Sequence, residues 1–416
     1  MSLAPRTTAP GTIRILRGGD RARDGRRPGP GAVIIGGDYV GLGIARRLGR
    51  RGVPVVVVDD ERTITRFSRY TSHAVQVQDL RDDEATRDTL LAAGERLGLD
   101  GWVLYPTRDE IVAAISKHRD ALGATYRVPV PEWRTVRWAS DKRNTYDLAA
   151  REGVPAPRTW YPRSTADLAD IDREPPFAVK PAIKEHFIYA TGAKAWRADT
   201  REELERLFVR ACEVTGGDDE VMVQELIPGG GDHQFAFCAF FRDGVSVGSM
   251  VARRIRQHPA EFGRATTFAE TVDIPTLQER SERLLRAIDY YGLAELEYKR
   301  DPRDGEYKLL DFNARAWGYH MLGPEAGVDF PVLLFEDQLG RPCAHQRARP
   351  GVRWIRRTTD LPTSAVELWA GRLRPREALR TFARDPDVEA VFSREDPGPG
   401  LAEVALLPYL MRKRGF

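Results

Sequence analysis

An acid, an amide and a base stand two residues apart in the segment LLDFNARAWGYH. They are Asp311, Asn313 and Arg315, and they follow directly on two leucines. Side chains alternate between the two faces of a strand, so a strand here would place these three opposite Leu310 and Phe312. Oxygen ligands beside a guanidinium could hold a metal ion and a charged substrate. A solvated strand edge is the alternative interpretation.

The preceding segment AELEYKRDPRDGEYK predicts the other strand of a hairpin that turns around PRDG. Pairing across this hairpin would bring Glu295 and Glu297 to the face that carries Asp311 and Asn313. Converging oxygen ligands suit Mg²⁺, which takes a few carboxylates together with phosphate oxygens. Considered alone, the hairpin is better explained by solvated polar pairs between the two strands.

Two lysines occupy positions that suggest placement at a cleft. Lys180 lies near the end of the strand predicted over PPFAVKPA, and Lys142 opens a helix beside Asp141. Further on, VQELIPGGGD places Glu225 after an alternating strand and Asp232 after a glycine turn. Each of these residues is more often an ordinary surface side chain when it occurs alone, so their order along the chain matters more than any one of them.

The segment IIGGDYVGLG resembles a dinucleotide-binding loop, and Asp59 or Asp60 at the end of the next strand resembles the acid that binds a ribose. The glycines do not follow the spacing GxGxxG, however. Strand-to-helix turns in many α/β domains need glycine for steric reasons alone. A structural turn, or a loop for another small ligand, is therefore favoured over a nicotinamide site.

The elements that would position these residues form a series of domains. Strand and helix patterns alternate from GAVIIGG onward and predict a βαβ domain with a parallel sheet, whereas later strands alternate as an antiparallel set. We therefore expect a mixed α/β and α+β chain. Its predicted parts are a flexible Arg/Pro/Gly-rich extension over 1–30, an α/β domain over 31–130, a small subdomain over 131–197, a large subdomain over 198–345 and a helical extension over 346–416.

Composition excludes several classes of protein. The 416 residues carry 64 basic and 61 acidic side chains, a net charge of +3, which argues against a dedicated nucleic-acid binder. No apolar run reaches the roughly 20 residues that span a membrane. The three cysteines are widely spaced and form no CxxC pair, which favours a reducing cytoplasm over a disulfide or zinc framework. The sequence leaves a homodimer open.

In their order along the chain, five segments resemble the ATP-grasp superfamily: DKRNTYDLAAREGVPAPRTW, PFAVKPA, VMVQELIPGGGD, GLAELEYKRD and YKLLDFNARAWG. With the preceding βαβ domain the resemblance covers roughly residues 31–345. The segments QELIPGGGD and YKRDPRDGEYKLLDFNAR and the closing YLMRKRG are similar to carboxylate–amine ligases of the D-aspartate ligase type. Such enzymes activate a carboxylate with ATP and pass it to an amine, so the resemblance implies an N-terminal pre-ATP-grasp domain before a two-subdomain ATP-grasp fold.

The resemblance also implies roles for individual residues. The implied nucleotide contacts are Lys142, Lys180, Lys194, Glu225, Ile227 through its backbone, and Asp232. The implied Mg²⁺ ligands are Glu297, Asp311 and Asn313. The implied catalytic residues are Arg315, Lys180 and Arg264. Glu297 is preferred to Glu295 because the ligand in this family has an apolar neighbour on either side, here in LEY.

The implied reaction is attack of a substrate carboxylate on the γ-phosphate of ATP, followed by transfer of the acyl group to an amine. Three features depart from the family. Asp311 stands where Glu is usual, and no glycine run covers the phosphates after Lys180, so that Lys184, His186 or, preferably, Lys194 would replace it. The basic segment ARRIRQHPAEFGRATTFAE is either a solvated hairpin or a clamp for an acidic group, with Arg264 best placed.

Two other functions stay open from the sequence. One is a non-catalytic nucleotide-binding protein of the same fold, against which the retention of both lysines and the acidic residues argues. The other is a nicotinamide-dependent oxidoreductase built on the glycine loop.

Overall fold

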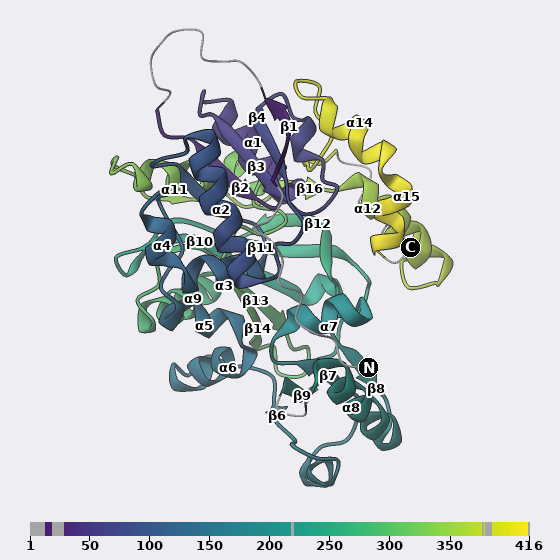
Figure 1. Ribbon diagram of the computed structural model, residues 1–416. Coiled ribbons are helices and arrows are strands. Elements are labelled where there is room, and N and C mark those ends of the chain that lie inside the picture. The colour runs from purple at the N-terminus through teal and green to yellow at the C-terminus, as the bar shows by residue number, and fades with distance from the viewer. Residues whose placement is uncertain (1–12, 19–28, 218–219, 377, 379–384, 415–416) are drawn as a thin grey trace.

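The computed structural model describes residues 13–18, 29–217, 220–376, 378 and 385–414. The chain forms three sheets, which Figure 1 shows from the N-terminal sheet at one end of the molecule to a small sheet at the other. A long antiparallel sheet lies between them. The predicted mixed α/β and α+β fold is confirmed. Within the described residues, no helix is long and apolar enough to cross a membrane.

The N-terminal sheet has the order β1-β4-β3-β2-β5. All its pairings are parallel except β1–β4. Its strands are β1 (Arg14–Gly18), β2 (Ala32–Ile35), β3 (Val55–Asp59), β4 (Thr71–Gln76) and β5 (Val103–Pro106). Its helices are α1 (Tyr39–Gly49), α2 (Asp83–Leu97), α3 (Asp109–Lys117) and α4 (Arg119–Gly123). Strand β1 belongs to the predicted extension, whose residues 1–12 and 19–28 lie outside the described part of the chain.

The small sheet has the order β6-β9-β7-β8. Its strands are β6 (Thr159–Trp160), β7 (Phe177–Pro181), β8 (Trp196–Ala198) and β9 (Val221–Glu225). Helix α7 (Lys184–Thr191) follows β7, and α8 (Arg201–Thr215) packs Leu204 and Phe208 against the buried face of the sheet. The apolar residues of α8 and β9 complete the core of the small sheet. Both elements lie after residue 197, where the small subdomain was predicted to end.

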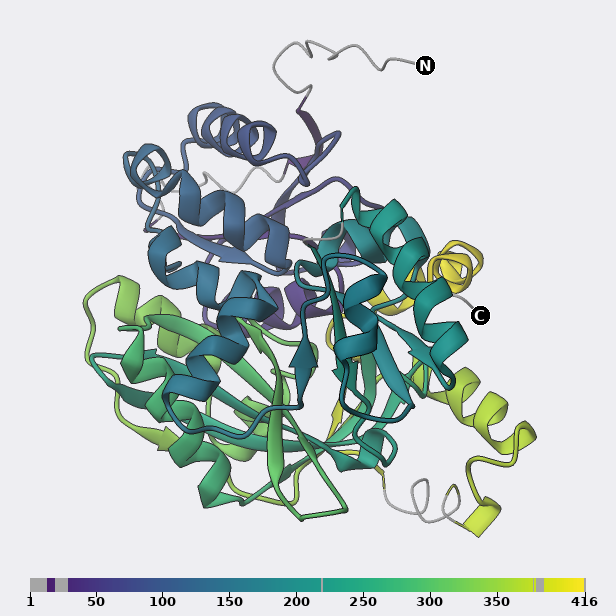
Figure 2. The ribbon, with the colours of Figure 1, turned by 90° about the horizontal axis from the view of Figure 1, so that it is seen from below.

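The large sheet has the order β14-β13-β10-β11-β12-β16-β17, with the short β15 beside β11. Its main strands are β10 (Gln234–Arg242), β11 (Val245–His258), β12 (Ala265–Val272), β13 (Gly292–Arg300) and β14 (Tyr307–Asn313). Its helices are α9 (Pro275–Ala287), α10 (Leu322–Ala326) and α11 (Phe330–Gln338). Figure 2 shows the molecule turned by 90° about the horizontal axis, with the strands of this sheet in teal to green.

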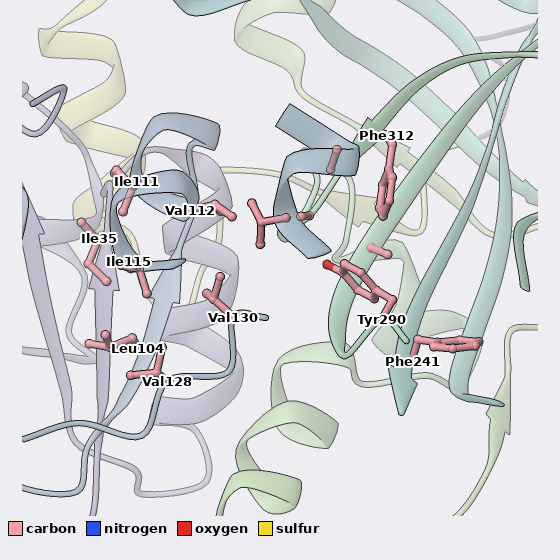
Figure 3. Packing of buried hydrophobic residues seen from close by; sticks show 14 of the residues in the cluster. Ile35, Leu104, Ile111, Val112, Ile115, Val128, Val130, Phe241, Tyr290 and Phe312 are labelled. Carbon is pink, nitrogen blue, oxygen red and sulfur yellow. The ribbon is translucent and has the colours of Figure 1, made fainter. Parts of the chain in front are cut away.

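Helices α5 (Trp133–Ser140) and α6 (Lys142–Arg151) join the N-terminal domain to the large sheet. Val136 and Leu148 from these helices share one apolar cluster with residues of both regions. Figure 3 shows the same cluster running from Ile35 and Leu104 in the N-terminal sheet to Phe312 on β14. The predicted small subdomain over 131–197 thus contributes its first two helices to the large sheet. This packing fixes the N-terminal domain against the strands that carry Asp311 and Asn313.

The predicted helical extension over 346–416 also contains strands. β15 (Gln346–Arg347), β16 (Arg353–Ile355) and β17 (Val388–Glu389) extend the large sheet. The helices after residue 345 are α12 (Arg357–Trp369), α14 (Gly398–Ala405) and α15 (Leu407–Arg414). A buried ion pair between Arg46 Nε and Asp396 Oδ2, 3.0 Å apart, holds this region to α1.

Candidate functional site

A cavity of about 730 Å³ lies between the small sheet and the large sheet. Its walls are formed by β7 and β9 on one side and by β11, β13 and β14 on the other. Eight of the residues singled out from the sequence line it: Lys142, Lys180, Lys194, Glu225, Ile227, Asp232, Glu297 and Asp311. Thr363 and Glu367 of α12 reach it too, although no chemistry was assigned to the chain after residue 345.

An acidic face on the hairpin of β13 and β14 is formed by Glu295, Glu297, Asp311 and Asn313, of which Glu297 and Asp311 line this larger cavity. Glu297 pairs with Asp311 across the hairpin, and Glu295 pairs with Asn313, so the predicted hairpin is confirmed. The Asn313 amide nitrogen donates to Glu295 Oε2 at 3.0 Å and to Glu297 Oε1 at 3.3 Å. Burial, followed by the neighbouring charge of Glu297, raises the pKa of Glu295 to about 7.

Two cations neutralise this acidic face. Lys142 Nζ, at the first turn of α6, donates to Asp311 Oδ1. Arg254 on β11 reaches Glu297 Oε1 with its Nη2 at 2.7 Å and also donates to Gln234 Oε1 at 2.6 Å. All four charged side chains are at most 11% exposed. Buried carboxylates are stable as ions only when they are paired in this way.

Lys180 is held differently from Lys142. Its Nζ donates to the Tyr146 hydroxyl at 2.9 Å and to Gln224 Oε1 at 2.7 Å, which are both neutral groups. Burial lowers the pKa of Lys180 to about 8, against a smaller effect of the Asp311 charge. Lys180 therefore places a desolvated ammonium in the larger cavity.

Glu225 lies at the end of β9 and is buried among donors. Its Oε1 accepts from the Arg158 amide at 2.9 Å, and its Oε2 accepts from Arg173 Nη1 at 2.8 Å and from Arg303 Nη2 at 3.0 Å. Burial opposes its charge, yet the Arg158 amide and Arg303 outweigh burial and lower the pKa of Glu225. Ile227 is buried beyond it, whereas Asp232 is exposed at the cavity edge.

A smaller cavity of about 240 Å³ adjoins the acidic face on the side of the N-terminal domain. It contains the other predicted residues, Arg264, Asn313 and Arg315. Its remaining walls include Asp38 from the loop before α1 and the segment 107–110 at the start of α3. The two cavities share three lining residues, which are Lys194, Arg254 and Glu297.

Arg315 and Arg264 enter the smaller cavity from the large subdomain. Arg315 Nη2 donates to Asp109 Oδ2 at 2.8 Å and to Asn313 Oδ1 at 3.1 Å, while its Nε is buried without a hydrogen-bond partner. Arg264 Nη1 donates to the Gly192 carbonyl at 2.8 Å. Within the described part of the chain Arg264 forms no ion pair, and burial lowers its pKa. The Lys184 and His186 side chains lie outside the described residues.

Comparisons with known proteins agree with this geometry. No protein-family model matches the chain. The chain is 25% identical over 325 residues to a D-aspartate ligase from Enterococcus faecium. The aligned region covers 74% of this chain and 76% of that enzyme. The L-amino acid ligase from Bacillus licheniformis superposes with a TM-score of 0.59 at 18% identity, over 76% of this chain and 75% of that one.

The biotin carboxylase domain of 2-oxoglutarate carboxylase from Hydrogenobacter thermophilus, a dimer solved with MgADP, gives a TM-score of 0.61 at 13% identity. That superposition covers 77% of this chain and 73% of the other. The chain has the fold of the ATP-grasp ligases. The predicted resemblance is thereby confirmed at the level of the fold, and these relatives agree with the predicted ligase class and with ATP and Mg²⁺ as cofactors.

The acidic face of this ATP-grasp chain fits Mg²⁺ by the chemistry of its donors. Glu297 and Asp311 offer carboxylate oxygens and Asn313 an amide oxygen, the hard ligands that Mg²⁺ prefers. The described residues contain no group of three or more His, Cys, Asp or Glu side chains arranged to hold a metal by themselves. A cation at this face would therefore take further ligands from phosphate, as Mg²⁺ does in nucleotide sites.

Protein groups occupy the space around the glycines of the segment IIGGDYVGLG. The Gly37 amide donates to Asp59 Oδ2 at 2.5 Å, and Asp59 Oδ1 accepts from the Glu61 amide at 3.0 Å. A Cβ atom at Gly36 would lie 2.1 Å from Thr107 Oγ1. Asp59 and Asp60, the two candidate ribose ligands, line neither cavity. The structure therefore favours the steric explanation of these glycines over a nicotinamide site.

Several residues at the ATP-grasp site were not assigned to it from the sequence. Tyr146 and Gln224 hold Lys180, and Arg254 contacts Glu297. Tyr146 follows Lys142 by one helical turn, which is a usable signal. Gln224 precedes Glu225 on a buried strand, where a polar side chain needs a partner. In the sequence Arg254 is one of several arginines in the segment ARRIRQHPAEFGRATTFAE. Nothing in the local sequence indicates its contact with Glu297.

Proposed function

We propose that the chain is an ATP-dependent carboxylate–amine ligase that works through an acyl phosphate and releases ADP and phosphate. The observation that carries this proposal is the junction of the two cavities. The larger one is sized for a cofactor, and it meets a small charged cavity at Lys194, Arg254 and Glu297. A nucleotide whose phosphates reach this junction would end beside a compact substrate.

In this proposal the larger cavity binds ATP. Lys142 and Lys180 neutralise the phosphates from the two sides of the cleft, and Lys194 contributes from the loop between α7 and β8. Glu225 and the Ile227 backbone lie at the adenine end, and Asp232 accepts from the ribose hydroxyls. Because the Glu225 side chain is already bonded to Arg158, Arg173 and Arg303, its contribution is to fix the β9 backbone at the adenine edge.

Glu297, Asp311 and Asn313 would hold Mg²⁺, which supplies charge neutralisation to the phosphoryl group when bound. Arg315 lies next to Asn313 and directs a guanidinium into the smaller cavity, where it would hold the transferred phosphoryl group. Arg264, which forms no ion pair among the described residues, offers a cation for the substrate carboxylate. Buried donors preorganised in this manner stabilise charge that develops during transfer.

The substrate class follows from the charges around the smaller cavity. Arginines and Lys194 share its walls with Asp38, Asp109 and Glu110. A zwitterion offers both signs of charge, so we propose an amino-acid-like substrate. The similarity to a D-aspartate ligase and the fold shared with an L-amino acid ligase support this class.

The test is a screen for ADP release across amino acids of both configurations, each with and without amine acceptors. The expected result is release that requires a carboxylate and rises with an acceptor, together with an amide product detected by mass spectrometry. Binding of MgADP with no release under any pairing would instead make the chain a non-catalytic nucleotide-binding protein.

We also propose a cytoplasmic location and a homodimeric assembly. The three cysteines are free thiols, as a reducing cytoplasm favours. A homodimer has the dimeric biotin carboxylase domain as its precedent. Gel filtration with light scattering tests whether the chain forms a homodimer.

A further inference from the structure

The two basic side chains that neutralise the acidic face contact two of the groups proposed to bind metal. Lys142 contacts Asp311, and Arg254 contacts Glu297 at 2.7 Å. A metal ion and a side-chain cation compete for the same carboxylate oxygens, since both neutralise the same charge. The acidic face of the ligand-free chain is therefore already neutralised by the protein itself.

The architecture explains how both cations reach the acidic face. Lys142 begins α6, and its amide donates to the Ala182 carbonyl at 3.0 Å, just beyond β7. This contact keeps the lysine between the small sheet and β14. Arg254 reaches across β10, since Ala236 of β10 pairs with Glu297 on one side and with Ala252 on the other.

Both cations also line the larger cavity, so each has an alternative partner when a nucleotide is present. A phosphate oxygen could replace the carboxylate as the acceptor for Lys142 Nζ. The carboxylate thereby released would become available to a divalent cation. Neither exchange leaves a buried charge without a partner, which is the outcome that would be costly.

We infer that Lys142 occupies the place of the metal ion in the ligand-free chain, and that Asp311 becomes available to Mg²⁺ only when nucleotide phosphates draw Lys142 away. Arg254 acts on Glu297 in the same manner. This inference rests on the proposed ATP site and concerns the order in which that site is filled. Free Mg²⁺ binds weakly, nucleotide and metal enter together, and each raises the affinity for the other.

The inference predicts a gain of function that an ordinary phosphate-binding lysine would not give. Removal of the Lys142 charge should tighten metal binding to the chain without nucleotide, even though it weakens nucleotide binding. The experiment titrates Mn²⁺ into the full-length nucleotide-free chain and measures free Mn²⁺ by electron paramagnetic resonance. Lys142→Met should bind Mn²⁺ on the order of tenfold more tightly than the wild type.

The matched control is Lys180→Met. Lys180 lines the same cavity and interacts electrostatically with Asp311, but its hydrogen bonds go to Tyr146 and Gln224. Its loss removes the same charge without releasing a carboxylate, so a gain below about threefold is expected. Lys142→Arg keeps a cation on Asp311 and should give no gain. Lys142→Met combined with Asp311→Asn should lose the gain.

Lys142→Met leaves Asp311 without its partner, so circular dichroism must confirm the fold. If that variant unfolds, Lys142→Gln tests the same point, because it keeps a hydrogen-bond donor and removes the charge. Unchanged or weaker Mn²⁺ binding in a folded variant, or an equal gain in Lys180→Met, overturns the inference. Because the readout needs neither nucleotide nor turnover, a failed ADP-release screen leaves this result interpretable.

Discussion

The two cavities contain similar side chains but are built differently. In the larger cavity two acid–base pairs are matched within the protein, Lys142 with Asp311 and Arg254 with Glu297. In the smaller cavity Arg264 forms no ion pair among the described residues, and Arg315 keeps a buried Nε without a partner. The first arrangement suits a ligand that arrives with its own counter-ion, such as MgATP. The second suits the carboxylate of a zwitterionic substrate, which arrives without a metal counter-ion.

The cavities also differ in which parts of the chain form their walls. Among the described residues the larger cavity is lined from residue 142 onward, whereas the smaller one also uses Asp38 and the segment 107–110 of the N-terminal domain. The contact between Asp109 and Arg315 in the smaller cavity joins residues 206 positions apart. Changes in the larger cavity should therefore affect nucleotide and metal together, while changes to the smaller cavity away from the acidic face should affect use of the carboxylate substrate.

The largest expected effect lies at Asn313, which lines the smaller cavity and contacts Glu297 at the junction. Asn313→Ala removes a donor to Glu295 and Glu297 and an acceptor for Arg315. ADP release should fall on the order of a thousandfold, as for loss of a preorganised group at a reacting phosphoryl. Circular dichroism should show a folded chain. Asn144→Ala, on α6 and outside both cavities, is the control, and activity near the wild-type rate in Asn313→Ala would show that the metal assignment is wrong.

A second substitution separates the cavities. Arg264→Ala should lower kcat/KM for the carboxylate about a hundredfold, because a desolvated guanidinium is lost, yet leave the Kd for MgADP within twofold of the wild type. Steady-state kinetics and calorimetry measure the two values. Arg253→Ala on the same strand pair serves as the control, since Arg253 contacts Glu270 and lines neither cavity. If Arg264→Ala weakened MgADP binding as much as it lowered kcat/KM, the two cavities would act as a single binding site.

The contrast between the cavities also explains what could be predicted from the sequence. Glu297, Asp311 and Asn313 share a face because strand side chains alternate with a period of two, and this regularity is local. The pairing of Lys142 with Asp311 and of Asp109 with Arg315 depends on how separate elements pack. No spacing in the chain encodes such contacts.

The same limit applies to the domain boundaries. The patterns of α8 and β9 predict a helix and a strand, but the choice of the sheet that they join depends on apolar contacts with β7. After residue 345, β16 has three residues and β17 has two, which is too short for an alternating pattern to be recognised. These strands form because neighbouring strands of the large sheet offer them hydrogen bonds.

A smaller effect is expected from pH in the larger cavity. Lys180 has a pKa of about 8, below its ordinary value of 10.5. It therefore loses its proton at a lower pH in the folded chain than in the unfolded chain. Nucleotide affinity should fall above pH 8, by at most about tenfold per pH unit, because the neutral amine no longer attracts phosphate. Calorimetry with MgADP from pH 7 to about 9.5 measures this, and Lys180→Arg should flatten the profile.

Raising the pH has the opposite effect on the contribution of Lys180 to the stability of the folded chain. Between pH 8 and 10.5 the unfolded chain binds more protons at Lys180 than the folded chain does. This residue's contribution to the free energy of unfolding therefore rises with pH across that window. A fall of nucleotide affinity that tracked unfolding would contradict the assignment of the effect to the ammonium.

The smallest effect tests whether the N-terminal domain merely surrounds the smaller cavity or also orients its chemistry. Asp109→Asn keeps an acceptor for Arg315 Nη2 but removes the charge that attracts it across the domain junction. We expect a decrease in kcat of about tenfold or less, since a hydrogen bond to a charged group contributes about 1.5–3 kcal/mol and part of it is retained.

The Kd for MgADP should not change in this variant, and Asp120→Asn on α4 controls for loss of one acid from the same domain. Asp109→Ala should lower kcat further than Asp109→Asn, because Arg315 then loses the acceptor as well as the charge. If both variants kept the wild-type kcat and raised only KM, Asp109 would contact substrate rather than position Arg315. The N-terminal domain would then supply binding groups to the smaller cavity without orienting the group that holds the phosphoryl.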